Sequence, residues 1–302
     1  MDNFSSRIAG VFYGGAAAEA AALEPEGTEY STGTQLTLYV ADGLLEVLEW
    51  SARGEAADPP AAIWLALLRW YKNRFGTFPE GLPPAPARRI DDHPLYPGEV
   101  EPATIAGLEE VEMGLPRKPH GVDATGTDAL VRAAPLGMLP QVDTNWVVTM
   151  SRQVAVLTHA DWLTPTAYSL VMYHLIAGKS LITAVTEVLT WRGEQQDGDE
   201  LAQQIRTGLS EDLDSPMTAR QVFPAAIRAV ADVLEQPVAP EQLFSAAVTQ
   251  AVHFGGNTPA TALLAGQLIG AIVGNTATGT PSYLNNYVAL EETVDRWISY
   301  TT

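Results

Sequence analysis

The sequence contains no cysteine among its 302 residues, which excludes disulfide bonds, thiolate metal sites and cysteine nucleophiles. Lysine is also scarce, since only Lys72, Lys118 and Lys179 are present, and the formal net charge is −19. A surface this acidic repels a phosphate backbone, so we expect no direct binding of nucleic acid. The same acidity keeps a protein in solution whatever its function, so it identifies no other partner.

Long hydrophobic runs are missing as well. The longest apolar stretch, Thr261 to Gly274, includes Gln267 and is shorter than the roughly 20 residues that span a bilayer. Near the start, Asp2 stands where a secretory signal would carry basic residues. We therefore expect a cytoplasmic protein that has no membrane segment.

Strand-like alternation of polar and apolar residues is lacking, and helical periodicity takes its place. For example, Leu36, Val40, Leu44 and Leu48 share one face of a helix that opens near Thr34. The sequence predicts one compact all-α domain over residues 1–302, with ten or more helices. The predicted helices cover residues 7–22, 34–48, 61–75, 130–138, 149–158, 165–177, 181–191, 224–234, 240–252, 259–273 and 287–298.

Proline is concentrated at residues 78–120, which we interpret as long connections around a short helix rather than a separate domain. Residues 192–200, RGEQQDGDE, are interpreted as a solvated turn. Gly266, Gly270 and Gly274 recur every fourth residue, which indicates close contact between helices or, alternatively, access of a ligand to the backbone.

Five segments resemble, in order along the chain, motifs of the ADP-ribosylglycohydrolase family. The resemblance implies that family's all-α fold and a cleft for ADP-ribose, a related nucleotide or an ADP-ribosylated protein. The segments are RIAGVFYGGAAAEA (7–20), YSTGTQLTLYVADGL (30–44), GTDALVRAAPLGM (126–138), THAD (158–161) and HFGGNTPATALLAGQLIGAIVG (253–274).

The family's acidic motifs hold a pair of magnesium ions, and this sequence departs from them. Where the family has Asp-Asp before Thr-Gln, the chain has Thr32 and Gly33. Where it has Gly-Gly-Asp-Thr-Asp-Thr, Asn257 and Pro259 replace the aspartates. Magnesium sheds its water reluctantly and binds proteins through carboxylates. We therefore expect no metal site and no cofactor.

The resemblance and the remaining polar residues give the candidate site. The catalytic candidates are Glu19, His159 and Asp161, although Glu19 also fits a partly exposed helix residue, and His159 and Asp161 fit a helix cap or a loop brace. Glu29, Asp42 and His253 are further polar residues near the expected cleft. The predicted ligand-binding residues are Ser31, Thr32, Thr34, Gly126, Thr127, Asp128, His159, Asp161, Gly255, Gly256, Asn257 and Thr258.

Three functions stay open. The favoured interpretation is a non-catalytic family member, a pseudoenzyme that binds an ADP-ribose-like molecule or acts as an interaction protein. The alternatives are a hydrolase of ADP-ribosyl bonds with a remodelled site and a structural module with a closed cleft. An open polar cavity favours binding or altered catalysis, whereas a cleft filled by Tyr30, Trp162 or Phe254 favours the structural module. Homo-oligomerisation is left open.

Overall fold

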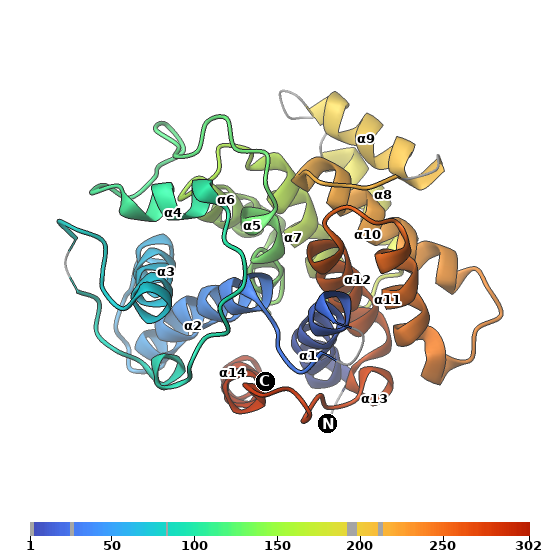
Figure 1. Cartoon of the computed structure of the whole chain (residues 1–302), viewed down its shortest axis with the longest axis horizontal. Helices are drawn as coiled ribbons and strands as arrows, with labels where there is room; N and C mark the ends of the chain where they lie inside the picture. The colour runs from blue at the N-terminus through green and yellow to red at the C-terminus, as the bar shows by residue number, and fades with distance from the viewer. Residues whose placement is uncertain (1–2, 25–26, 83, 192–197, 211–213) are drawn as a thin grey trace.

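Two helices from opposite ends of the chain, α1 (Asn3–Leu23) and α12 (Thr258–Val273), lie side by side in the computed structural model (Figure 1). A Cβ atom added at Gly270 would lie 2.0 Å from the carbonyl oxygen of Gly10, and one at Gly14 would lie 2.5 Å from that of Gly266. Only glycine permits this approach of one backbone to the other. The glycines that recur every fourth residue from Gly266 therefore serve the close packing of α12 against α1.

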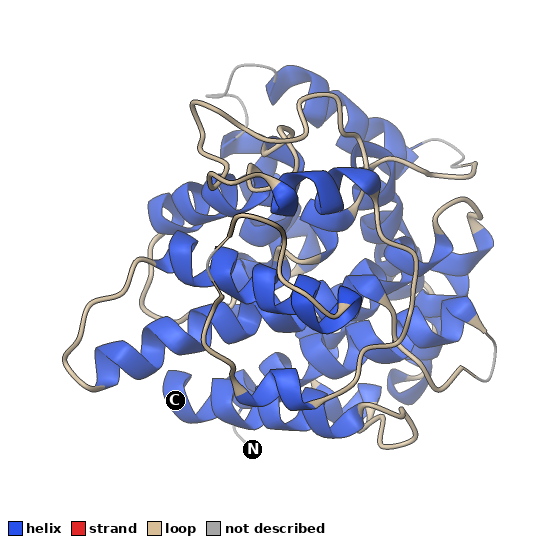
Figure 2. Ribbon diagram, turned by 60° about the vertical axis from the view of Figure 1, so that its left-hand side comes forward, coloured by secondary structure: helices blue, strands red, loops and turns tan. Residues whose placement is uncertain are grey.

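The structure describes residues 3–24, 27–82, 84–191, 198–210 and 214–302, and within these ranges it contains helices and loops but no strand (Figure 2). The all-α prediction is confirmed. The other helices are α2 (Thr32–Ala52), α3 (Pro59–Phe75), η1 (Arg89–Asp92), α4 (Pro102–Glu109), α5 (Asp128–Val131), η2 (Ala134–Gly137), α6 (Thr144–Ala155), α7 (Leu163–Ile176), α8 (Leu181–Trp191), α9 (Gly198–Ser210), α10 (Ala219–Leu234), η4 (Pro240–Gln242), α11 (Leu243–His253), α13 (Asn275–Thr278) and α14 (Tyr287–Thr301).

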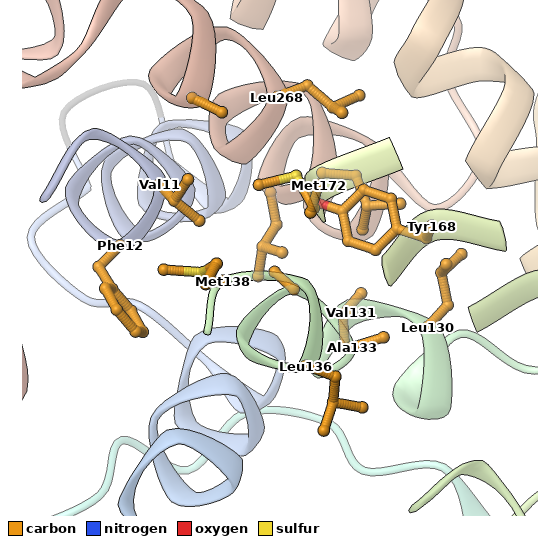
Figure 3. Close-up of a cluster of buried hydrophobic side chains, with 14 of the residues drawn as sticks. Val11, Phe12, Leu130, Val131, Ala133, Leu136, Met138, Tyr168, Met172 and Leu268 are labelled. Atoms are coloured by element: carbon orange, nitrogen blue, oxygen red, sulfur yellow. The ribbon is translucent and has the colours of Figure 1, made fainter. Parts of the chain in front are cut away.

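One continuous set of buried apolar side chains connects helices from both halves of the chain. Its centre brings together α1, α5, η2, α7 and α12 (Figure 3). Within it, Tyr168 donates its hydroxyl hydrogen to Gln267 Oε1 at 2.5 Å, so both of these buried polar atoms are partnered. This core fixes the ends of α1, α2, α5 and α12, which surround the site described below.

Several helices differ from their predicted bounds, and α6 begins at Thr144 rather than at the predicted residue 149. The helix predicted at 130–138 is broken into α5 and η2, because Pro135 provides no amide hydrogen and restricts the backbone. Helix α10 begins at Ala219, five residues before Pro224, so this proline lies inside the helix rather than at its start. Helix α9 was missed, and it begins within the predicted turn at 192–200, of which 192–197 lie outside the described residues.

No helix in the described ranges combines the length and the apolar character needed to cross a membrane.

Candidate functional site

A cavity of about 520 Å³ lies where the N-terminal ends of α2 and α12 approach the segment that precedes α4. The two altered motif loops, at 31–33 and 257–260, both line it, as the resemblance implies. Its lining consists of Glu19, Leu23, Ser31, Thr32, Gly33, Tyr96, Pro97, Gly98, Glu99, Val100, Glu101, Pro102, Thr127, Asp128, Val131, Asn257, Pro259 and Ala260.

Glu19 of α1 caps the N-terminus of α2. Its carboxylate accepts hydrogen bonds from the amide nitrogens of Ser31, Gly33 and Thr34 at 3.0 to 3.1 Å, and from Ser31 Oγ at 3.0 Å. These amides are among the first in the helix and have no partner within it. Burial raises the pKa of Glu19, and the bonds from Thr34 and Ser31 oppose that rise. The side chain is only 2% exposed, so the expectation of a partly exposed helix residue was wrong.

The neutral residues at the lost aspartate positions bind other parts of the protein. Thr32 Oγ1 donates to the carbonyl oxygen of Glu99 at 2.5 Å, which ties the start of α2 to the segment before α4. Asn257 caps α12, because its Oδ1 accepts from the amide of Ala260 at 3.3 Å, and its Nδ2 donates to Thr127 Oγ1 at 3.2 Å. These side chains now connect the cavity walls to one another.

Glu101 accepts four hydrogen bonds, as many as Glu19. Its carboxylate accepts hydrogen bonds from the amide and the hydroxyl of Thr127, from the amide of Asp128 at 3.1 Å, and from His159 Nε2 at 2.9 Å. Burial alone would raise the pKa of Glu101, but the bonds from His159 and the Thr127 amide outweigh it and lower the pKa. Glu101 is therefore an ionised acceptor.

A chain of hydrogen bonds behind Glu101 fixes the tautomer of His159. The ionised Glu101 carboxylate can only accept, so His159 Nε2 carries a proton and donates it. In the neutral ring Nδ1 then carries no proton and accepts from Thr158 Oγ1 at 2.7 Å, while that hydroxyl oxygen accepts from Arg132 Nη2 at 2.8 Å. Burial lowers the pKa of His159 despite the bond to Glu101, so the neutral imidazole is favoured at neutral pH.

Asp128 lies beside Glu101, but its surroundings shift its pKa in the opposite direction. Its Oδ2 accepts from Thr104 Oγ1 at 2.7 Å and from the amide of Glu101 at 3.3 Å, while Oδ1 accepts neither of these bonds. Burial and the charge of Glu101 raise the pKa of Asp128 to about 7. The cavity thus contains two adjacent carboxyl groups whose pKa values move apart.

Of the predicted ligand-binding residues, five line the cavity and the rest lie beside it or away from it. Thr34 and His159 contact the lining acids Glu19 and Glu101, and Gly126 packs against the Glu101 carboxylate. Thr258, the first residue of α12, does not line the cavity. The five residues in the lining are Ser31, Thr32, Thr127, Asp128 and Asn257.

Asp161 lies elsewhere, and its catalytic candidacy loses its basis. Its carboxylate accepts from Thr164 Oγ1 and from Arg220 Nε, both at 2.9 Å, so it braces the start of α7 as the structural interpretation suggested. Gly255 and Gly256 adopt positive φ angles of 71° and 66° in the turn before α12, and neither lines the cavity. Their role in the described structure is to turn the chain.

The additional polar candidates also lie outside the lining. Glu29 accepts a hydrogen bond from Asn285 Nδ2, and His253 is exposed at the end of α11. Asp42 is buried among arginines. The cavity is open, because Tyr30, Trp162 and Phe254 are absent from its lining, so the closed structural module loses its main support.

The segment at 96–102, which supplies much of the lining, was not among the predicted site residues. The segment follows η1, ends at the first residue of α4 and passes the N-terminal end of α2 (Figure 1). Gln35 Nε2 donates to the Tyr96 carbonyl at 2.8 Å, and Arg74 Nη2 donates to the Gly98 carbonyl at 2.6 Å, so side chains of α2 and α3 hold it. The prolines of this segment predicted only a connection. Its two acids, Glu99 and Glu101, were the feature of the sequence that could have indicated a site.

The side chains present do not fit a magnesium pair. Within the described ranges, no three histidine or acidic side chains converge closely enough to hold a metal ion. Pro259 offers no side-chain oxygen, and Thr32 and Asn257 offer neutral oxygens that other groups already use. The expectation of no metal cofactor stays a prediction.

Comparison with known proteins connects this site to a family. The model of the ADP-ribosylglycohydrolase family matches residues 1–297. The chain belongs to this family. A solved structure described as an ADP-ribosylglycohydrolase-related protein complex is similar over 100% of both chains, with a TM-score of 0.68 and 19% sequence identity, which shows the fold. No curated protein matches the chain.

Proposed function

We propose that the chain is a ligand-binding ADP-ribosylglycohydrolase-family protein that lacks the magnesium-dependent hydrolysis implied by the family's motifs. The observation that supports this most directly is the open cavity with Thr32, Gly33, Asn257 and Pro259 in place of the four motif aspartates. ADP-ribose, a related nucleotide or an ADP-ribosylated protein is the ligand that the family resemblance suggests.

Without the four motif aspartates, the cavity lacks the metal ions that would stabilise charge during hydrolysis. Cleavage of a glycosidic bond needs charge stabilisation and a positioned nucleophile as the bond breaks. Metal ions provide both when carboxylates hold them in place. Loss of one preorganised group of this kind commonly lowers the rate by a factor of about 10² to 10³. Such effects do not simply multiply, but several groups are missing here together.

Two measurements test the proposal. Release of ADP-ribose from ADP-ribosylated arginine or serine should not exceed background, with or without magnesium. Thermal melting in millimolar magnesium should show no saturable shift, because an ion that binds the native state must raise its stability. A magnesium-dependent turnover, or a saturable magnesium shift, would contradict the proposal.

A hydrolase with a remodelled, metal-independent site is the second candidate, and the Glu101–Asp128 pair favours it. Neighbouring carboxyl groups whose pKa values move apart are typical of acid–base pairs in catalysis. Asp128 would be the proton donor, since its pKa is raised to about 7, and Glu101 would stay ionised. Metal-independent turnover that Asp128→Asn abolishes without unfolding the protein would replace the first proposal by this one.

A further inference from the structure

The charge of the cavity is unusual for a site expected to bind a pyrophosphate. Its lining contains four carboxyl groups, those of Glu19, Glu99, Glu101 and Asp128, and no lysine, arginine or histidine. A pyrophosphate is itself doubly negative and would be repelled unless a cation accompanied it. The lining therefore selects against the anionic part of an ADP-ribose-like molecule.

Nearby positive groups do not cancel this charge. His159 contacts Glu101, but burial lowers its pKa and favours the neutral ring. Arg132 is fully buried and is not part of the lining. Five backbone amides at the cavity are already occupied by its own acids, those of Ser31, Gly33 and Thr34 by Glu19 and those of Thr127 and Asp128 by Glu101.

A buried side chain in this lining has an atom left for a ligand. Asp128 is 6% exposed and lines the cavity, and its two hydrogen bonds both go to Oδ2. Oδ1 is thus available to accept from a ligand donor. A carboxylate buried to this degree gains more from a cationic donor than an exposed one does, because water screens the pair less.

The shape of the acidic lining favours an organic cation over a metal ion. No three of the described acidic or histidine side chains lie close enough to hold a metal, so the charge is spread around the cavity. The mouth also carries apolar surface, since Leu23 and Tyr96 both line the cavity and are 39% and 38% exposed. An exposed aromatic ring beside carboxylates can bind a cation through its face.

We propose that this cavity binds an organic cation, a molecule with an amine or guanidinium group on an apolar body, in preference to an anionic nucleotide. The charged group would lie among Glu99, Glu101 and Asp128, and the apolar body would lie against Tyr96 and Leu23. This inference rests on the proposed function, because it concerns the ligand of the same cavity, and it departs from what the family resemblance suggests.

Calorimetric titration of the full chain can test the inference with four probes: benzylguanidine as the cation, benzyl alcohol as its neutral counterpart, ADP-ribose, and magnesium chloride alone. Saturable binding of benzylguanidine, at least about 10-fold tighter than that of benzyl alcohol and weakened by salt, is expected. ADP-ribose without magnesium and magnesium alone should not bind. At pH 7, benzylguanidine should also displace protons from Asp128, so the binding heat should differ between buffers of different ionisation enthalpy.

Substitutions in the lining test whether the cation binds in this cavity. Glu99→Gln removes an exposed charge of the lining and should weaken benzylguanidine binding several-fold, whereas Glu110→Gln, an equally exposed change outside the lining, should not. Asp128→Asn should abolish the buffer dependence. If Asp128→Asn does not fold, Glu99→Gln and Tyr96→Leu still decide the question.

The outcomes separate this inference from the proposed function. Absence of benzylguanidine binding, or binding that Glu99→Gln and Tyr96→Leu leave unchanged, would overturn the inference. Binding of ADP-ribose in its place would overturn the inference while supporting the proposed function. Hydrolysis of an ADP-ribosyl bond would instead overturn the proposed function.

Discussion

Glu19 and Gly33 fit together as a pair at the start of α2. Glu19 Oε1 accepts the amide hydrogen of Gly33 at 3.0 Å, and a Cβ atom at position 33 would lie 2.8 Å from that same oxygen. The family motif has aspartate where the chain has Gly33, and the first family motif, which ends in Gly-Asp-Ala, has aspartate where the chain has Glu19. The longer glutamate and the glycine without a side chain are therefore complementary changes, and an aspartate at 33 could not be restored without moving Glu19.

A double-mutant cycle tests this pairing. Gly33→Ala should destabilise the protein by about 1 to 3 kcal/mol through overpacking, although alanine is favoured over glycine in a helix by about 1 kcal/mol. The double variant Glu19→Asp/Gly33→Ala should lose less than the sum of the two single losses, because the shorter acid vacates the space. Urea denaturation of the four proteins measures the coupling.

The recovery of stability in the double variant should be incomplete, and a second pair of substitutions provides the control. The added Cβ would also lie 2.7 Å from Leu263 Cδ1, so the double variant should not regain the full stability of the wild type. Combining Gly33→Ala with Glu55→Asp, an exposed and distant change, should be additive. Additivity in the Glu19 cycle as well would show that the two residues are independent.

The all-α fold and the two motif loops could be predicted because helical periodicity and motif order lie in the sequence itself. The role of Glu19 could not, since a carboxylate that bonds the amides of Ser31, Gly33 and Thr34 is defined by the packing of two helices. Glu101 was missed for a similar reason. It lies in a proline-rich segment whose path across the cavity depends on distant anchors such as Gln35 and Arg74.

Asp42 joins three distant parts of the chain and should be essential for stability. It is buried and binds Arg69 of α3 at 2.8 Å, Arg88 before η1 at 2.7 Å and Arg296 of α14 at 3.0 Å. Burial would raise the pKa of Asp42, but these arginines lower it. Asp42→Asn removes the one carboxylate that all three arginines share and leaves them only Glu46, Glu49 and Asp91. We therefore expect a loss of about 3 to 5 kcal/mol in the free energy of unfolding.

Urea denaturation checks this expectation. Glu55→Gln, which removes the exposed partner of Arg53, provides the control and should change the stability by less than about 0.5 kcal/mol. If Asp42→Asn costs no more than the control, the cluster contributes nothing to stability.

The contact between α1 and α12 gives a prediction that opposes helix propensity. Gly270→Ala should favour an isolated helix by about 1 kcal/mol. In the protein, its Cβ would lie 2.0 Å from the backbone oxygen of Gly10, and backbone cannot move aside as a flexible side chain can. We expect net destabilisation by at least about 2 kcal/mol, seen as a lower melting temperature. An unchanged melting temperature would mean that the two helices can separate at little cost.

The pH dependence of stability should identify the contribution of Asp128. Its pKa is raised to about 7, against about 3.9 in an unfolded chain, so folding favours its protonated form. That stabilisation is fully present below about pH 4 and is lost as the pH rises through about 7, with a slope of up to about 1.4 kcal/mol per pH unit. Above about pH 7 no further loss is expected from this group.

Groups beside Asp128 also contribute to the pH dependence of stability, and their contributions must be separated from that of Asp128. The pKa of Glu101 is lowered, so its stabilisation is lost only as the pH falls below about 4.5. The pKa of His159 is lowered as well, so this residue destabilises the folded protein at low pH, and that destabilisation is lost as the pH rises toward about 6.5, which opposes the Asp128 effect. Arg132 stays charged throughout this range. The quantity to compare is therefore the difference between the wild type and Asp128→Asn, since both retain Glu101, His159 and Arg132.

Asp128→Asn keeps an oxygen that can accept the hydroxyl hydrogen of Thr104, now 2.7 Å away, but it cannot titrate. Between pH 5 and 7 the wild type should lose stability relative to this variant, and above pH 7.5 the difference should be constant. Asp123→Asn, an exposed change in the loop that precedes α5, is the matched control. Urea denaturation at half-unit steps of pH measures all three proteins. A wild-type stability that runs parallel to that of Asp128→Asn across this range would mean that Asp128 is ionised in the folded protein, and the proton release expected on cation binding would then fail with it.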